Sequence, residues 1–130
     1  MSRPKGRPPR ILVVDDDPEI ATMLSRSLTR RGFAIETTAS ADEALARVAN
    51  TTYEAALLDL VMPGQDGAAL ATQLRAKIPG LPVALLTGYT HSPLLAAAER
   101  QGVAVFIKPV VIQEIVEYLE REIGETAERG

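Results

Sequence analysis

The sequence contains no cysteine and only one histidine. The lack of cysteine excludes a disulfide framework, thiolate zinc sites and cysteine nucleophiles, and a single histidine excludes any site built from two imidazoles. The longest apolar runs fall far short of the roughly 18 residues that a membrane span requires. No G-x-G-x-x-G, Walker-A or G-x-S-x-G motif is present, so nucleotide binding and acyl transfer have no recognisable anchor.

The composition is that of one ordinary globular domain, with 130 residues of which 46% are hydrophobic and 24% charged. Four of the 14 basic residues lie in the first ten positions, which hold no acid, so the rest of the chain has ten basic against 17 acidic residues, a net charge of −7. An acidic body argues against direct nucleic-acid binding. We expect a flexible basic leader over residues 1–9, a folded domain over 10–124, a polar tail over 125–130, no membrane contact and a cytoplasmic location.

The body of the chain alternates between short apolar runs and amphipathic segments. We predict strands over residues 11–14, 33–38, 55–58, 83–86 and 103–107, with a helix after each of them. Helix-start signals support this interpretation, because Asp17 precedes Pro18 and because Ser40 with Glu43 fits a capping box. The strict alternation predicts an α/β fold with one five-stranded parallel sheet and helices on both of its faces.

Polar side chains follow four of the predicted strands. They are Asp15 and Asp16 after the first strand, Asp59 after the third, Thr87 after the fourth and Lys108 after the fifth. Because functional groups in such sheets gather beyond the carboxyl ends of the strands, we expect these side chains to lie together. Three carboxylates against one lysine leave the charge unbalanced, which favours a hard divalent cation, Mg2+ rather than Ca2+. A carboxylate beside a cation, a lysine and a hydroxyl has the parts needed to receive a phosphoryl group.

The residues at these strand ends belong to four motifs in order along the chain. They are Ile-Leu-Val-Val-Asp-Asp-Asp (11–17), Asp-Leu-Val-Met-Pro-Gly-Gln-Asp-Gly (59–67), Leu-Thr-Gly (86–88) and Lys-Pro (108–109). With these motifs the sequence resembles the receiver domain of bacterial two-component response regulators, from about residue 10 to residue 124. The resemblance implies a doubly wound, flavodoxin-like sheet with strand order 2-1-3-4-5 and five flanking helices.

The resemblance also implies a role for each residue at the strand ends. Asp59 would be the phosphoacceptor, and Lys108 would contact the phosphate. Asp16, Asp59 and the backbone carbonyl of Val61 would bind Mg2+, with Mn2+ as the alternative ion. Asp15 would act on the same ion mostly through a water molecule.

The function implied by the resemblance is a signalling switch rather than an enzyme that acts on other molecules. A sensor histidine kinase or a histidine phosphotransfer protein would supply the phosphoryl group, and the chain would catalyse only its own phosphorylation and dephosphorylation. Thr87 would swing toward the phosphoryl group, and the bond before Pro109 would be cis. The helix after the fourth strand, the fifth strand and the last helix would then present a changed surface to a downstream protein target.

Two other functions compete with a phosphorylated switch. A pseudo-receiver that only binds other proteins would keep the fold but would not be phosphorylated. A magnesium phosphatase with an aspartyl intermediate is disfavoured, because Val61 stands where a second acid two residues after Asp59 could protonate a leaving group. No output domain fits after Gly124, so we expect a regulator of one domain, with a receiver from a longer protein as the alternative.

The fifth predicted strand departs from the usual pattern of these receivers. Their lysine normally follows a Tyr or Phe by three residues, whereas here Val105 holds that position and Phe106 is the aromatic. Side chains alternate between the faces of a strand, so Phe106 should face the side opposite to Val105. Either a bulge restores the register, or the aromatic switch is missing.

Several further residues near the motifs need an interpretation. Val61 and Tyr89, each two residues after a site residue, would flank the phosphoryl group and offer little to orient an attacking water, which predicts a long-lived phosphorylated form. Asp17 and Asp66 precede predicted helices and are expected to cap them rather than to bind the metal. His91 is expected to be an exposed loop residue.

Overall fold

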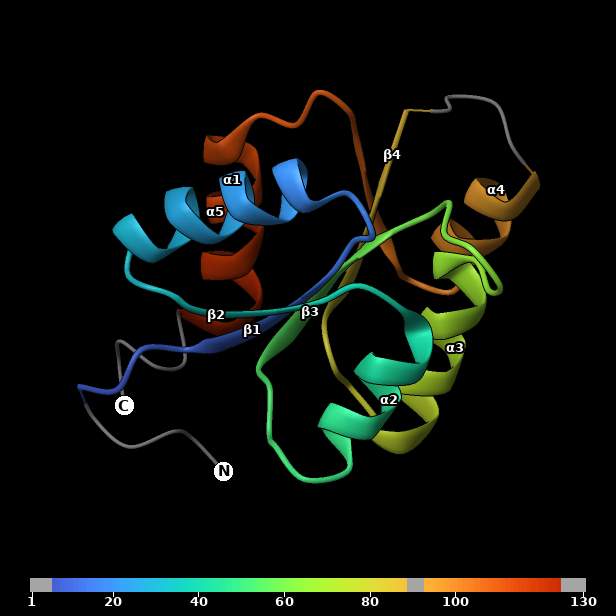
Figure 1. The fold of residues 1–130 in the computed structure, drawn as a ribbon, viewed down its shortest axis with the longest axis horizontal. Coiled ribbons are helices and arrows are strands. Elements are labelled where there is room, and N and C mark those ends of the chain that lie inside the picture. The colour runs from blue at the N-terminus through green and yellow to red at the C-terminus, as the bar shows by residue number, and fades with distance from the viewer. Residues whose placement is uncertain (1–5, 89–92, 125–130) are drawn as a thin grey trace.

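A parallel sheet of five strands forms the centre of the computed structural model, which describes residues 6–88 and 93–124 (Figure 1). The strands are β1 (Arg10–Val14), β2 (Ala34–Thr38), β3 (Ala55–Asp59), β4 (Val83–Thr87) and β5 (Ala104–Ile107). Their order in the sheet is β2-β1-β3-β4-β5, and every neighbouring pair is parallel. The predicted α/β fold and the strand order 2-1-3-4-5 are confirmed.

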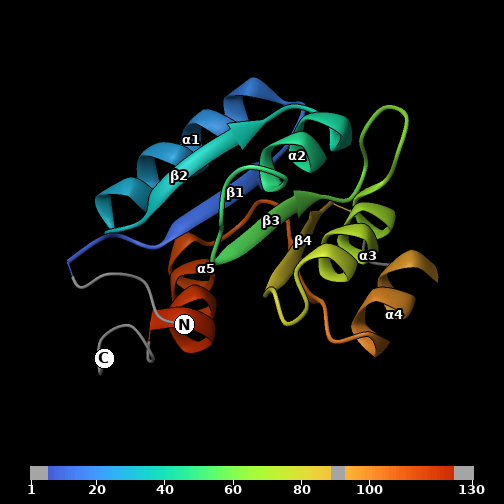
Figure 2. The same cartoon turned by 90° about the horizontal axis from the view of Figure 1, so that it is seen from below.

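The described residues form five α-helices and a final π-helical turn. They are α1 (Pro18–Arg30), α2 (Ala41–Val48), α3 (Gly67–Lys77), α4 (Pro93–Arg100), α5 (Ile112–Leu119) and the π-helical turn η1 (Glu120–Gly124). Helices α1 and α5 cover one face of the sheet, and α2, α3 and α4 cover the other (Figures 1 and 2). Within the described ranges, no helix combines the length and the apolar character that a membrane crossing requires.

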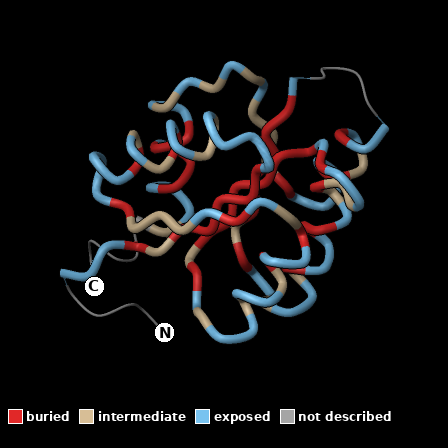
Figure 3. The backbone as a smooth tube through the Cα atoms, in the orientation of Figure 1, coloured by how far each residue is buried: buried red, intermediate tan, exposed pale blue. Residues whose placement is uncertain are grey.

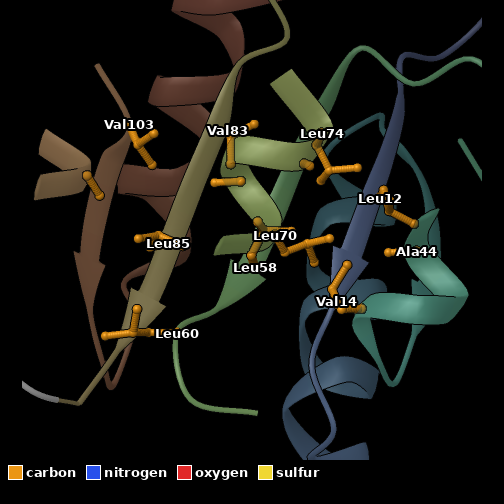
Figure 4. Packing of buried hydrophobic residues seen from close by; sticks show 14 of the residues in the cluster. Leu12, Val14, Ala44, Leu58, Leu60, Leu70, Leu74, Val83, Leu85 and Val103 are labelled. Carbon is orange, nitrogen blue, oxygen red and sulfur yellow. The ribbon is translucent and has the colours of Figure 1, made fainter. Parts of the chain in front are cut away.

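The side chains of the central strands alternate between two separate apolar clusters. Leu12 and Val14 of β1 pack beneath α2, α3 and α4, where Figure 4 shows them near Ala44. Ile11 and Val13 join the cluster beneath α1 and α5. These four side chains are fully buried, and the tube in Figure 3 shows the same for the middle of the sheet. Since burying one such side chain stabilises a fold by roughly 1.5–3 kcal/mol, the continuous apolar runs of the sequence explain why these strands lie at the centre.

Two of the aspartates near the strand ends cap helices, as predicted. The Asp17 carboxylate accepts a hydrogen bond from the backbone N–H of Glu19 at 2.9 Å, at the start of α1. The Asp66 carboxylate accepts one from the backbone N–H of Ala69 at 2.8 Å, at the start of α3. These bonds satisfy backbone donors that the first turn of a helix leaves unpaired.

Gly67 brings the start of α3 against the end of β3. Its backbone N–H donates to the carbonyl oxygen of Leu60 at 2.8 Å. A Cβ atom built at Gly67 would lie 2.3 Å from the carbonyl oxygen of Asp59, a distance that real Cβ atoms essentially never show. Only glycine therefore allows the chain to turn this closely behind Asp59.

An ion-pair network stabilises the amino end of the sheet, where the strands begin. The backbone N–H of Arg10 donates to the Glu54 carboxylate at 2.7 Å, and its guanidinium lies 3.4 Å from the Glu36 carboxylate. Glu36 also accepts hydrogen bonds from Arg47 at 3.0 Å and from the Tyr53 hydroxyl at 2.6 Å. Burial raises the pKa of Tyr53 above its ordinary value, and the hydrogen bond to Glu36 raises it further. Charged side chains of this kind discourage a further strand from pairing with the edge strand β2.

The structure differs from the predicted elements in small ways. Each strand boundary lies within one residue of its predicted position. The last helix changes from α to π at Glu120, which the sequence did not predict, because apolar residues at Ile115, Leu119 and Ile123 fit both kinds of turn.

Candidate functional site

Three aspartates gather at the carboxyl edge of the sheet. Asp15 and Asp16 follow β1, Asp59 ends β3, and β1 and β3 are hydrogen-bonded neighbours. One carboxylate oxygen from each of the three residues lies within 4.8 Å of the other two. Asp15 and Asp59 are buried, whereas Asp16 is exposed. The cluster therefore has a closed side within the protein and an open side toward solvent.

Lys108 reaches this cluster from the end of β5. Its ammonium nitrogen lies 3.3 Å from Asp59 Oδ1, within hydrogen-bond distance, and 3.6 Å from Asp15 Oδ2. The backbone N–H of Lys108 donates to the carbonyl oxygen of Thr87 at 2.7 Å, which fixes the lysine to the end of β4. The peptide bond between Lys108 and Pro109 is cis, as the resemblance implied.

The electrostatics of the cluster are unbalanced, because one ammonium group faces three carboxyl groups. Burial raises the pKa of the Asp15 carboxyl above its ordinary value, and the negative charge of Asp59 raises it further. The backbone N–H of Asp17, which donates to Asp15 Oδ1 at 2.8 Å, and the charge of Lys108 act in the opposite direction. A positive ion at this point would offset the remaining repulsion.

The donor atoms of the cluster fit a hard divalent cation. Among the residues that the structure describes, the atoms that could hold a metal here are all carboxylate oxygens. Asp15 Oδ2 is buried, forms an ion pair with Lys108 at 3.6 Å and accepts no hydrogen bond among the described residues, so it has a lone pair for a cation or for a water bound to one. Val61 lies beside Asp59 and donates its backbone N–H to Asp59 Oδ1 at 3.3 Å, while its side chain is 53% exposed.

Thr87 is the buried last residue of β4, and its neighbour Leu86 pairs in register with Asp59. The hydroxyl of Thr87 therefore lies at the same edge of the sheet as the acids. Along its strand, Thr87 is one residue further toward the carboxyl end than the residue paired with Asp59. Tyr89, which was expected to flank the phosphoryl group, and His91 lie outside the described residues.

Phe106 lies on the side of the sheet opposite to Val105, as strand alternation requires. The pairing of β5 with β4 runs without a bulge over the described strand, so Val105 packs with the cluster beneath α2, α3 and α4. Phe106 packs beneath α5 instead, where its ring meets Tyr118 edge to face at a centroid distance of 5.6 Å. The guanidinium of Arg121 lies 5.7 Å from the centre of the Tyr118 ring. A valine thus packs at the position three residues before Lys108, and the aromatic residue of β5, Phe106, contacts Tyr118 of α5 instead.

Sequence reasoning gave no role to Thr38, a buried polar residue beside the cluster. Thr38 ends β2 and is buried, and together with Asp15 and Asp16 it lines a cavity of about 570 Å³. The signal for Thr38 in the sequence is weak, because a pair of threonines at the end of the second strand carries no charge that would mark a site.

Comparisons with known proteins agree with this geometry. Residues 11–120 match the sequence model of the response regulator receiver domain. The chain is 36% identical over 120 residues to the DNA-binding transcriptional regulator NtrC of Salmonella typhimurium (strain LT2), and the alignment covers 92% of this chain and 26% of NtrC. The chain thus spans about a quarter of the length of the NtrC proteins that it matches.

Solved structures give the same result. A CheY-like response regulator receiver domain protein from Methanospirillum hungatei superimposes with a TM-score of 0.85 at 29% identity, covering 95% of this chain and 99% of that one. The response regulator TrrA of Thermotoga maritima, solved in complex with Mg(2+)-BeF, has a TM-score of 0.80 at 31% identity and covers 88% of this chain and 98% of its own. Sequence, fold and the acidic cluster thus agree, and the chain belongs to the response regulator receiver domain family of two-component systems.

Proposed function

We propose that this chain is a phospho-accepting switch of a two-component phosphorelay and that Asp59 is its phosphoacceptor. The observation that carries the proposal is the position of the Asp59 carboxylate, which ends a central strand within reach of two further acids and of the Lys108 ammonium. A carboxylate that lies beside a lysine and two further acids is suited to attack a phosphoryl group.

Asp16, Asp59 and the backbone carbonyl of Val61 would hold Mg2+, or Mn2+ in its place, and Asp15 would contact it through a water molecule. The three carboxylates that the described residues bring together support this assignment, as does the buried Asp15 Oδ2, which forms an ion pair with Lys108 but accepts no hydrogen bond among those residues. When bound, the ion supplies positive charge that offsets the charge of the phosphoryl oxygens during transfer.

In the transfer step, an oxygen of Asp59 attacks the phosphorus of a phosphohistidine on the partner. A P–O bond to Asp59 forms as the P–N bond breaks, and the electron pair of that bond leaves on the imidazole nitrogen, which takes up a proton. Lys108, 3.3 Å from Asp59 Oδ1, is positioned to neutralise a phosphoryl oxygen. The partner that supplies the group is a sensor histidine kinase or a histidine phosphotransfer protein, and we expect the exchange to take place in the cytoplasm.

The output of the switch would be a change in protein binding. The hydroxyl of Thr87 would bind the new phosphoryl oxygen and draw the loop before α4 with it. The surface formed by α4, β5 and α5 would then meet the downstream protein target, and apolar side chains on it are available for that contact. Leu94, Ile107 and Val111 are 42%, 44% and 53% exposed.

One observation favours the competing function of a protein-binding module that is never phosphorylated. Val105 takes the place where receivers usually carry an aromatic residue, so the usual response of β5 to phosphorylation is not built into this strand. The two functions differ in whether Asp59 carries a phosphoryl group.

Intact-protein mass spectrometry after incubation with acetyl phosphate and MgCl2 distinguishes the two functions. We expect the mass of one phosphoryl group to be added, and the adduct to be stable in acid and labile in base. The adduct should be absent in Asp59→Asn and in wild-type protein treated with EDTA. A folded wild-type protein that gains no phosphoryl group under these conditions would contradict the proposal and support the binding module.

A further inference from the structure

A cavity of about 570 Å³ adjoins the acidic cluster on the side away from Lys108. It lies between α1, the ends of β1 and β2, and the start of α2. Its polar lining includes Asp15, Asp16, Thr22, Ser25, Thr38 and Glu43. The cavity is therefore large and polar enough to hold ordered water next to the acids.

The described part of the chain contains two buried side-chain oxygens without a hydrogen-bond partner, and both belong to residues that line this cavity. They are Asp15 Oδ2 and Thr38 Oγ1. Thr38 is only 6% exposed, so bulk solvent does not satisfy its hydroxyl. A buried polar group left unpaired costs about 1–3 kcal/mol, and native proteins rarely leave one so. Asp15 Oδ2 has the ammonium group of Lys108 at 3.6 Å, so the hydroxyl of Thr38 is the oxygen that still requires a partner at the site.

The backbone fixes Thr38 beside the first acid of the cluster. Thr38 pairs in register with Val14, the residue before Asp15. The backbone N–H of Asp15 then donates to the carbonyl oxygen of Thr38 at 3.1 Å. A threonine hydroxyl both donates and accepts hydrogen bonds, so it suits a water molecule that is itself bound to a cation.

We propose that Thr38 is a positioning residue of the cation site, and that its hydroxyl binds a water of the cation's hydration shell on the β2 side of Asp15. The inference rests on the cation of the proposed function and adds a residue that none of the sequence motifs contains. Mg2+ keeps several waters when proteins bind it, and the groups that hold those waters contribute to its affinity. Removing such an outer partner typically weakens metal binding about 10–100-fold.

Titration calorimetry of the full chain with MgCl2 tests the inference. Thr38→Val removes the hydroxyl and keeps the shape of the side chain, and we expect it to weaken Mg2+ binding about tenfold. Thr38→Ser keeps the hydroxyl and should bind Mg2+ like the wild type. Thr37→Val is the matched control, because Thr37 lines the same cavity on the same strand but is exposed, and its affinity should not change.

The unfolding midpoint in EDTA supplies a second readout. If the hydroxyl serves only the cation, Thr38→Val should be at least as stable as the wild type without metal, because a buried unpaired group has been replaced by a methyl group. Thr38→Ala, which also lacks the hydroxyl, should repeat the loss of Mg2+ affinity.

Three results would overturn the inference. They are equal Mg2+ affinity in Thr38→Val and the wild type, an equal loss in Thr38→Ser and Thr38→Val, and a loss of the same size in Thr37→Val. In each of these results the wild type still binds Mg2+, so the proposed cation site stands. A wild type that binds no Mg2+ would instead overturn the proposed cation site and this inference together.

Discussion

The ammonium group of Lys108 lies 3.3 Å from the carboxylate of Asp59, although 49 positions separate the two residues in the sequence. Three neighbouring parallel strands, β3, β4 and β5, bring them to one edge of the sheet. The same ammonium lies 3.6 Å from Asp15. Lys108 is therefore placed to offset part of the repulsion among the acids whenever no metal ion is bound.

This arrangement predicts opposite effects for two substitutions on the stability of the metal-free protein. Lys108→Met leaves Asp15 and Asp59 without their counter-charge, and we expect it to lower the free energy of unfolding by about 1–3 kcal/mol. Asp59→Asn removes one of the repelling charges and should raise it by about 0.5–2 kcal/mol. Urea denaturation in EDTA, followed by circular dichroism, measures both changes. Shifts of the two variants in the same direction would contradict this account of the site.

Gly67 should be as important for the site as its charged residues. In Gly67→Ala the new Cβ would lie 2.3 Å from the carbonyl oxygen of Asp59, so the backbone at the end of β3 must move. We expect a loss of stability of about 1–3 kcal/mol together with slower phosphorylation by acetyl phosphate. Gly88→Ala is the control for stability, because its Cβ would meet no atom within 4 Å. Wild-type stability and labelling rate in Gly67→Ala would show that the loop has room to adjust.

The protein should lose stability in alkali through Tyr118. Burial raises the pKa of Tyr118 above its ordinary value, so the folded protein keeps the proton while the unfolded chain loses it near pH 10. The stabilising effect is therefore complete below about pH 10 and falls as the pH rises further, by up to about 1.4 kcal/mol per pH unit.

Tyr118→Phe should make this alkaline loss shallower while leaving the edge contact with Phe106 in place. Tyr53, whose pKa is also raised, still contributes to the remaining slope. Urea denaturation at pH 8 and at pH 11 provides the comparison. The prediction is wrong if the free energy of unfolding falls equally in the wild type and the variant.

Val61 should prolong the life of the phosphorylated form. Its apolar side chain is 53% exposed beside Asp59 and has no polar group to orient an attacking water. We expect Val61→Asn to shorten the lifetime several-fold and Val61→Ala, which remains apolar, to leave it close to the wild-type value. Tyr89→Ala should also shorten it. The decay of the phosphorylated mass after removal of acetyl phosphate is the measurement, and unchanged decay in both Val61→Asn and Tyr89→Ala would refute the hypothesis.

The fold and the position of the acids were predictable because both follow from local rules. The apolar run from Ile11 to Val14 has the length and composition of a buried parallel strand, and its end positions Asp15 beside Asp59 once the sheet is parallel. The capping roles of Asp17 and Asp66 were equally accessible, since a cap depends on residues two or three positions away.

The features that could not be predicted depend on distances between elements. The contact of Phe106 with Tyr118 requires the angle at which α5 crosses the sheet, which the apolar spacing of a helix does not contain. The unpaired hydroxyl of Thr38 is visible only when every neighbour of the side chain is known. The change to a π-helical turn at Glu120 likewise leaves the apolar pattern of the last helix unaltered.

The attachment of β1 at Arg10 has a practical consequence for studying partner binding. Arg10 is tied to Glu36 and Glu54 where the strands begin, and the acids stand where they end, a strand length of roughly 15 Å away. A biotin or fluorophore coupled upstream of Arg10 would be attached at the edge of the sheet where the strands begin, away from the acidic cluster. Immobilisation through that point should leave the acidic cluster free to meet a kinase in solution.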